Sequence, residues 1–289
     1  MITVVCALCA LILFSCTGIN DNNDYGIDYN SERENASSSQ NISTYENNRK
    51  PFLDLINSIP DYYQRSGRFG GFPDEGSAYC GPAAASNALM WLYRNDYGKI
   101  IEKSGNSLKD QYELIKLLGS QKYFDTTKDG TNPNELCLGL KKFFDDRGIK
   151  NVKIEYYGWR RMDSQFKSGD TTVDLNLIKE RLRSRGAVLL NYGWYKYDAQ
   201  KDEYTRTGGH WVTLAGFGHD GSKENPHALI INDPDMRVQS ANYIITKRVE
   251  SGSLKGVLSG LPRKAEGFYK FKSSSRGVGI IDGAVVIST

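Results

Sequence analysis

The sequence has 289 residues, enough for one large domain with a sizeable hydrophobic core. Its 39% hydrophobic and 25% charged residues are typical of a globular protein and exclude a coiled coil, a collagen-like chain, a polytopic membrane protein and a wholly disordered chain. The net charge is only +3 and the Lys and Arg residues form no block, so no nucleic-acid partner is expected.

Residues 1–16 are predicted to be an export signal. Residues 2–15 carry no charge and are almost all apolar, and this length suits the hydrophobic region of a signal peptide better than a spanning helix. Residues 13–16 (LFSC) resemble the lipoprotein box of bacteria, which implies that Cys16 becomes the lipid-bearing first residue of the mature protein. We therefore expect an exported bacterial lipoprotein, held at the cell envelope or cell surface by a lipid anchor on Cys16. A buried amino-terminal strand is the alternative.

Residues 17–50 are predicted to be a disordered tether. They contain eight Asn and few large aliphatic residues, too little apolar surface to offset the entropy of ordering. Residues 51–289 show no internal repeat and no long linker, so we expect them to fold as one domain. Two cysteines lie in this domain, Cys80 and Cys137, and their different local contexts favour separate roles over a disulfide.

The first half of this domain is predicted to be helical. Apolar residues recur at helical spacing in four segments. Each segment begins with a capping residue or Pro, and the last three end in Gly. Ser107 is expected to cap the second helix. The expected helices run from Pro82 to Tyr93, from Ser107 to Gly119, from Asn132 to Gly148 and from Asp174 to Gly186.

The second half is predicted to be a sheet. Runs of β-branched and aromatic residues alternate with Gly, Asp, Asn and Pro, which break strands. Helices followed by antiparallel strands indicate an α+β domain. The expected strands cover Ala187–Tyr197, Trp211–Phe217, Ala228–Ile231, Tyr243–Thr246 and Val278–Ile287.

Cys80 is the first candidate for chemistry. It stands directly before the apolar helix, where unpaired backbone NH groups and the positive end of the helix dipole stabilise a thiolate. Gly81 leaves space beside the sulfur, and Pro82 is tolerated in a first helical turn. The alternative is a buried inert cysteine, because free Cys is among the most buried residue types.

His210 is the natural partner for this thiol. It stands at the start of a predicted strand, after two glycines that allow another chain to approach closely. The other two histidines, His219 and His227, lie in polar segments typical of turns. A general base is therefore expected at His210, and a purely structural histidine is the alternative.

An acid that orients the imidazole is expected at the end of the next strand. Asp233 follows the apolar run that starts at Ala228, and it lies 23 positions after His210, about the length of a hairpin with its loop. A carboxylate there would fix the tautomer of the ring and stabilise the imidazolium. Asp235 is the rival candidate, and a plain turn at Asn-Asp-Pro-Asp is the alternative.

These motifs resemble those of papain-like cysteine peptidases. Residues 79–85 (YCGPAAA), 209–212 (GHWV) and 232–234 (NDP) are similar to the enzymes that process bacteriocin leaders, and more distantly to the immunoglobulin-degrading endopeptidases of streptococci. The resemblance covers most of residues 70–289. It implies a papain-like α+β fold with Cys80 as nucleophile, His210 as base and Asp233 as orienting acid.

At the position of the second oxyanion donor, this sequence differs from both families. The resemblance implies Gln about six residues before the cysteine or Lys about ten before it, where this sequence has Asp74 and Gly70. The backbone NH of Cys80 can supply one donor, and Gln64, Arg68 and Ser77 are candidates for another. Loss of one such donor costs about 3 kcal/mol of transition-state stabilisation.

The sequence therefore predicts a cysteine endopeptidase that acts on a protein or peptide substrate through Cys80, His210 and Asp233, without a cofactor or a metal. Two alternatives stay open. The same triad order occurs in transglutaminase-like acyl transferases, and the missing oxyanion residue is compatible with a catalytically silent binding module on the cell surface.

Overall fold

The computed structural model describes residues 53–54, 58–236, 242–256 and 262–289. The predicted signal peptide at 1–16, its Cys16 and the predicted tether at 17–50 lie outside the described residues. Within the described ranges, no helix has both the length and the hydropathy needed to cross a membrane.

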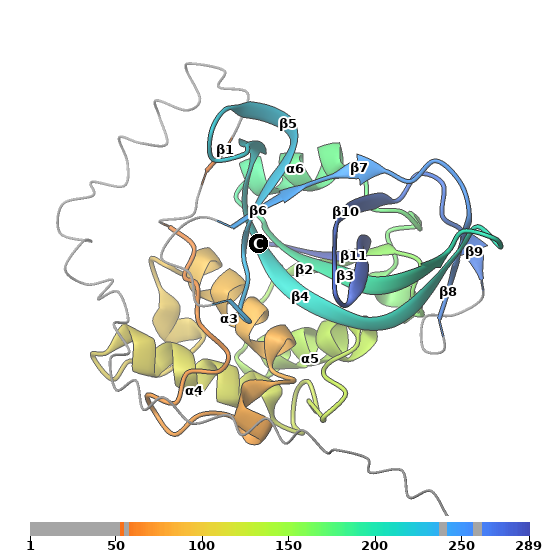
Figure 1. Ribbon diagram of the computed structural model, residues 1–289. Coiled ribbons are helices and arrows are strands. Elements are labelled where there is room, and N and C mark those ends of the chain that lie inside the picture. The colour runs from red at the N-terminus through yellow and green to blue at the C-terminus, as the bar shows by residue number, and fades with distance from the viewer. Residues whose placement is uncertain (1–52, 55–57, 237–241, 257–261) are drawn as a thin grey trace, which may run out of the picture.

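Four α-helices occur in the described part of the chain, and all of them precede β3 (Figure 1). Three short 3₁₀ segments accompany them: η1 (Pro73–Gly76), η2 (Tyr97–Lys99) and η3 (Ser164–Phe166). The α-helices are α3 (Cys80–Leu92), α4 (Ser107–Gly119), α5 (Pro133–Asp146) and α6 (Leu175–Arg183).

The helix starts follow local capping chemistry. Asn132 and Glu135 form a reciprocal capping box at the start of α5, and the Asp174 side chain accepts from the backbone of α6. The expected cap at Ser107 was wrong by one residue, because the side chain of Asn106 accepts the bond from Lys109 N. Helix α6 also ends at Arg183, earlier than predicted.

Among the described residues, the sheet has eleven strands and is mostly antiparallel. Its central path runs β6-β5-β4-β3-β11-β10-β7, while β2 pairs with β11, β1 pairs with β4, and β8 lies parallel to β4 and antiparallel to β9. The longer strands are β2 (Lys153–Gly158), β3 (Ala187–Asp198), β4 (Glu203–His219), β5 (Glu224–Asn232), β6 (Asn242–Ile245), β10 (Tyr269–Ser274) and β11 (Gly277–Ser288). The short strands are β1 (Leu53–Asp54), β7 (Lys247–Arg248), β8 (Ser253–Lys255) and β9 (Arg263–Lys264).

The α+β prediction is confirmed at this level, with four helices and a large, mostly antiparallel sheet among the described residues. Each of the five expected strands is present, at slightly different bounds. The largest difference is β4, which begins at Glu203 instead of Trp211 because it continues back through the hairpin with β3.

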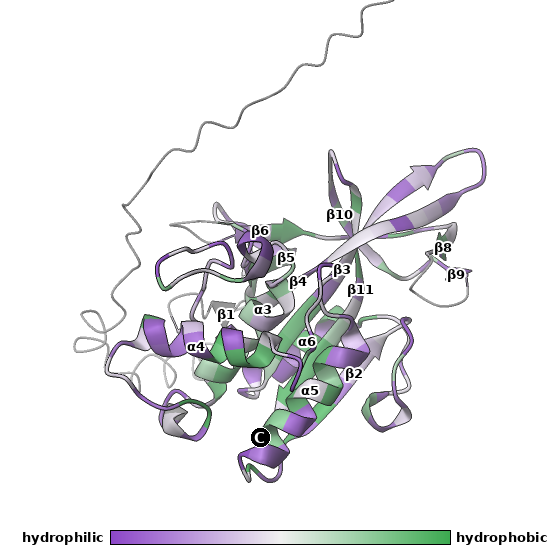
Figure 2. Ribbon diagram, turned by 90° about the horizontal axis from the view of Figure 1, so that it is seen from below, coloured by the Kyte–Doolittle hydropathy of each residue, from purple (hydrophilic) through white to green (hydrophobic). Residues whose placement is uncertain are grey.

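Helices and sheet meet over one main hydrophobic core. Helix α3 packs against β4 and β3, α4 packs on α3, and α5 packs against β2 and β11. Hydrophobic segments gather where these elements face one another (Figure 2). Helix α3 is the most enclosed of the helices, since every residue from Cys80 to Trp91 is buried. This places the first turn of α3 in a packed environment.

The packing of α5 gives a test of this arrangement. A Cβ added at Gly139 would lie 2.4 Å from Phe124 Cδ1 and 2.5 Å from the backbone oxygen of Tyr123. We expect Gly139→Ala to lower the free energy of unfolding by about 1–3 kcal/mol, although Ala favours a helix over Gly by about 1 kcal/mol. Urea unfolding measures the change. Gly67→Ala, where a Cβ meets nothing within 4 Å, is the control and should change it by less than about 0.5 kcal/mol; equal or higher stability of Gly139→Ala would contradict this packing.

Candidate active site

Cys80 is the first residue of the buried helix α3, and 8% of its surface is exposed. The preceding residue, Tyr79, provides no side-chain cap, and the first intrahelical bond runs from Ala83 N to Tyr79 O. The amides of Cys80 and Gly81 therefore lie ahead of the helical hydrogen-bond ladder, where they can stabilise negative charge. The predicted position of the thiol at a helix start is confirmed.

Two side chains of β4 bond this strand to α3 and to the segment before α5. Thr213 Oγ1 donates to the backbone oxygen of Ala84 at 2.9 Å, and Trp211 Nε1 donates to the backbone oxygen of Thr131 at 2.8 Å. Gly81 fits closely into the same contact, since a Cβ there would lie 3.0 Å from Thr131 Cβ. These bonds bring His210, the residue before Trp211, to the N-terminus of α3.

His210 and Asp233 form a direct side-chain pair. The imidazole Nε2 lies 2.5 Å from Asp233 Oδ1, and both residues are buried. The pairing of Thr213 with Asn232 in β4 and β5 sets this approach, because Asp233 follows Asn232 directly. The same Asp233 oxygen accepts the backbone NH of Asp235 at 3.0 Å. The side chain of Cys80 lies close enough to His210 to raise the pKa of the ring. Because Asp233 takes Nε2, Nδ1 is the ring nitrogen left for the thiol.

The electrostatic balance at His210 favours the protonated ring. Burial lowers the pKa of His210, but the hydrogen bonds to Asp233 and Cys80 and the charges of both groups raise it, and the result is a pKa raised from 6.5 to about 10. The structure thus brings together the three predicted residues Cys80, His210 and Asp233. An imidazolium next to a thiol and a carboxylate is the arrangement that stabilises a nucleophilic thiolate.

Asp235, the rival acid, has different partners. Its Oδ1 lies 2.5 Å from Arg65 Nε, and its Oδ2 lies 3.9 Å from Arg276 Nη2. It contacts the pair only through its backbone NH, which donates to Asp233. The geometry therefore favours Asp233 as the group that orients His210.

The three candidate oxyanion donors make other contacts. Gln64 is buried, and its Nε2 donates to the backbone oxygens of Gly76 at 2.7 Å and Ser77 at 3.4 Å. Arg68 is exposed, with its guanidinium 5.5 Å from the centre of the Phe69 ring. Ser77 is exposed too. None of these contacts assigns a second donor, so the backbone NH of Cys80 is the one donor that the arrangement supports.

Residues 59–64 contribute contacts to the site that sequence reasoning missed. Asn232 Nδ2 donates to the backbone oxygens of Ile59 at 2.9 Å and Pro60 at 3.0 Å, and Gln64 N donates to Pro234 O at 2.8 Å. Asp61 lies between these attachments, close enough to Asp233 for its pKa to respond to that charge. The nearest signal in the sequence was a single Asp in a run of apolar and aromatic residues.

Aromatic side chains surround the imidazole on the β3 side. The Tyr192 ring lies 5.4 Å from His210, edge to face, and contacts Trp194 and Phe271 in the same manner. Asn191, the register partner of Trp211, donates from Nδ2 to the backbone oxygen of His210 at 3.2 Å. Ring packing and a backbone bond thus restrict the motion of His210.

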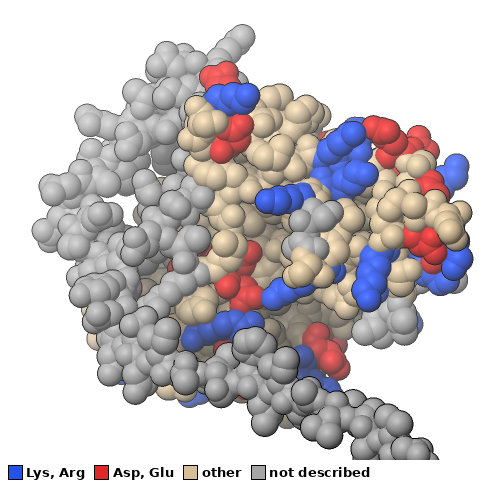
Figure 3. Space-filling model, viewed as in Figure 1, with Lys and Arg blue, Asp and Glu red and all other residues tan. Residues whose placement is uncertain are grey.

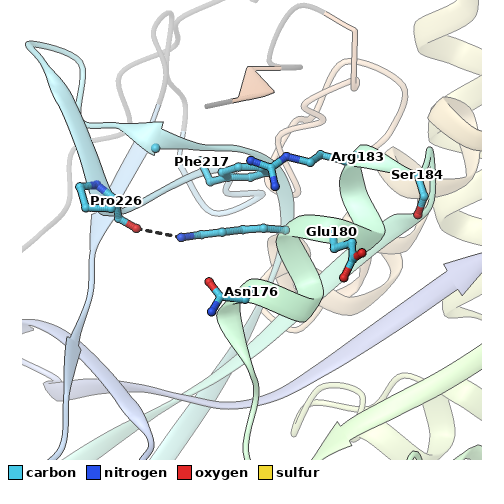
Figure 4. A pocket seen from close by; sticks show the side chains of 8 residues that line it. Asn176, Glu180, Arg183, Ser184, Phe217 and Pro226 are labelled. Carbon is cyan, nitrogen blue, oxygen red and sulfur yellow. Dashed lines mark hydrogen bonds between the residues drawn. The ribbon is translucent and has the colours of Figure 1, made fainter. Parts of the chain in front are cut away.

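A separate pocket lies away from Cys80, His210 and Asp233 (Figure 4). This cavity of about 670 Å³ lies between α6 and the Phe217 end of β4, and Lys179 Nζ donates there to the backbone oxygen of Pro226 at 2.8 Å. Cys80, His210 and Asp233 are not among the residues that line it. Among the described residues, no cluster of His, Cys, Asp and Glu has the arrangement of a metal site. Figure 3 shows basic and acidic side chains intermixed on the face it presents.

Comparison with known proteins adds no assignment: no family model matches this sequence, and no curated protein matches it either.

The raised pKa of His210 predicts how stability depends on pH. A group with a higher pKa in the folded than in the unfolded state contributes stability fully below its unfolded value, and loses it as the pH rises through the folded value. We therefore expect the excess stability of the wild type over His210→Gln to be largest below about pH 6.5 and to shrink toward pH 10. Unfolding free energies at pH 6, 8 and 10 measure it.

The exposed His227 provides the matched control, because its side chain lies outside the site. The fall in the difference from wild type toward pH 10 should be larger for His210→Gln than for His227→Gln. A His210→Gln difference that is constant or grows with pH would contradict the prediction.

Proposed function

We propose that this protein is a cysteine peptidase with a papain-like fold and a Cys80, His210, Asp233 triad. The observation that carries the proposal is the His210–Asp233 bond of 2.5 Å beside a thiol at the start of a buried helix. A nucleophile on a helix, packed against an antiparallel sheet whose neighbouring strands carry the base and the acid, agrees with the fold that the sequence motifs imply. The protein or peptide substrate is part of the proposal.

The proposed reaction follows from these positions. Cys80 transfers its proton to Nδ1 of His210, and the thiolate attacks the peptide carbonyl carbon. The backbone NH of Cys80 donates to the oxygen that gains charge. His210 then protonates the leaving amine, and water activated by the neutral imidazole hydrolyses the thioester. Asp233 keeps the Nε2 proton directed toward itself throughout, so that Nδ1 faces the sulfur.

The silent binding module is the second candidate, because Gln64 Nε2 already donates to backbone oxygens and no second oxyanion donor is assigned. Acyl transfer to an amine needs the same triad and is separated from hydrolysis by its product. Export and attachment through Cys16 remain proposals that rest on the sequence of residues 1–16.

Thiol labelling tests the nucleophile. Burial raises the pKa of Cys137 far above its ordinary value, whereas Cys80 lies beside His210. We expect iodoacetamide at pH 6–7 to modify Cys80 at least about tenfold faster than Cys137, as measured by peptide mass mapping, and to abolish hydrolysis of a casein substrate.

Cys137→Ala is the matched control and should keep both labelling of Cys80 and hydrolysis, while Cys80→Ala should lose both. Full hydrolysis after stoichiometric labelling of Cys80 would refute the peptidase proposal. Labelling of Cys80 no faster than of glutathione would instead favour the silent module, and incorporation of a labelled amine in place of hydrolysis would favour acyl transfer.

The two acids make a second test. Since Asp233 and not Asp235 contacts the imidazole, we expect Asp233→Asn to lower kcat/KM by about 10²–10⁴-fold through loss of the productive tautomer. Asp235→Asn removes the ion pair with Arg65 and should lower it by less than about tenfold. Steady-state kinetics on one peptide substrate measure both, and the reverse order of effects would assign the orienting role to Asp235.

A further inference from the structure

The segment from Ile59 to Gln64 is attached along the end of β5, next to the proposed acid. Besides the bonds from Asn232 and Gln64 described above, Tyr62 N donates to Asn87 Oδ1 on helix α3 at 3.2 Å. This segment therefore has attachments on both sides of Asp61, to the strand that carries Asp233 and to the helix that carries Cys80. The position of Asp61 is fixed by both elements of the site.

The Asp61 carboxyl is enclosed and incompletely paired. Its Oδ1 is buried and has no hydrogen-bond partner. Burial, and secondarily the charge of Asp233, raise the pKa of Asp61 to about 7. Asp233 uses its Oδ1 for both His210 and Asp235 N, which leaves its second oxygen as an acceptor for a neighbouring acid.

We propose that Asp61 is a positioning residue that holds a proton beside Asp233, so that the two carboxyl groups carry one negative charge while Asp233 orients His210. This inference rests on the proposed function. Two carboxyl groups in one enclosed site cannot both ionise without strong repulsion, and sharing one proton removes that repulsion. The proton on Asp61 would also restrain the Asp233 side chain, since it fills the acceptor site that His210 leaves free.

Several charged or titratable groups lie near Asp61 and Asp233. Their positions decide whether ionisation of Asp61 stabilises or destabilises the imidazolium of His210. The segment that carries Asp61 is bonded to Asn232 and Pro234, on either side of Asp233, the partner of His210. We therefore expect the negative charge of an ionised Asp61 to stabilise the imidazolium and with it the thiolate. The groups near the pair on each packed element are Cys80 on α3, Tyr192 on β3, His210 on β4, Asp233 and Asp235 after β5, Arg65 on the loop before α3, and Arg276 between β10 and β11.

Carbon-13 NMR of the full chain, labelled at the Asp carboxyl carbons, tests the pair without any need for activity. The signal that disappears in Asp61→Asn identifies Asp61, and the exposed Asp74, removed in Asp74→Asn, provides the control signal. We expect Asp61 to titrate near neutral pH and its midpoint to fall by about one pH unit in Asp233→Asn. A wild-type midpoint below about pH 5 would overturn the pair even if Asp233→Asn did not fold.

Alkylation of Cys80 between pH 5 and 9 then tests the effect on the site. Asp61→Asn should match the wild type within about twofold below pH 6, where Asp61 is protonated, and react about three- to tenfold more slowly at pH 8. Asp74→Asn should follow the wild type throughout, because Asn tolerates the positive φ of 50° at that position. A merely structural Asp61 would lower stability without changing the shape of the profile.

The two measurements separate the two proposals. Superimposable alkylation profiles for wild type and Asp61→Asn would overturn the positioning role. A wild-type Cys80 that reacts no faster than a free thiol at any pH would overturn the peptidase proposal, and the NMR midpoint would still decide whether Asp61 and Asp233 share a proton.

Discussion

The hydrogen bond between His210 and Asp233 depends on the register of β4 and β5. Thr213 pairs with Asn232, the last residue of β5, so Asp233 leaves the strand within side-chain reach of His210. The same Thr213 donates to the backbone of α3, and Trp211 in the same strand donates to the backbone of Thr131, two residues before α5. A slip of one residue between β4 and β5 would separate the acid from the imidazole, and it would remove none of the bonds to the helices. The sheet register is thus the constraint on which the candidate site rests.

The two thiols of the described domain show which physical effect decides reactivity. Both Cys80 and Cys137 are buried, and burial alone raises the pKa of Cys137. Cys80 differs in having an imidazole partner and the free amides of a helix start. A helix N-terminus is worth about 0.3–1 kcal/mol, up to about 2 kcal/mol when partly buried, which is less than the several kcal/mol of desolvation that burial imposes on an isolated ion. In the proposed mechanism, the ring of His210 therefore supplies most of the stabilisation of a Cys80 thiolate.

The parts that sequence reasoning predicted are those whose causes are local. Asn132, Pro133 and Glu135 specify a helix start among themselves, and α5 begins there. Apolar runs predicted the central strands because burial on a sheet selects such residues wherever the partner strand lies. The candidate triad also followed from local patterns, since Cys80 begins α3 and Asp233 directly follows β5. His210 was expected at the start of a strand, and the structure places it inside β4. The cap of α4 moved from Ser107 to Asn106 because both residue types can cap, and only the backbone conformation chooses between them.

The attachment of residues 59–64 had no comparable signal, and the reason is physical. Asn232 donates to the backbone oxygens of Ile59 and Pro60, and Gln64 donates through its backbone to Pro234, so one partner in every bond is main chain that any residue would supply. Such contacts do not restrict the residue type of the partner that bonds through its main chain. They therefore leave no sequence pattern from which the attachment could be predicted. Short strands at the sheet margin, such as β7 and β9, share this property, because two residues are too few for alternation to show. The environment of Asp61 is therefore a property of the tertiary structure: its Oδ1 is buried in a segment whose neighbouring residues bond to Asn232 and Asn87.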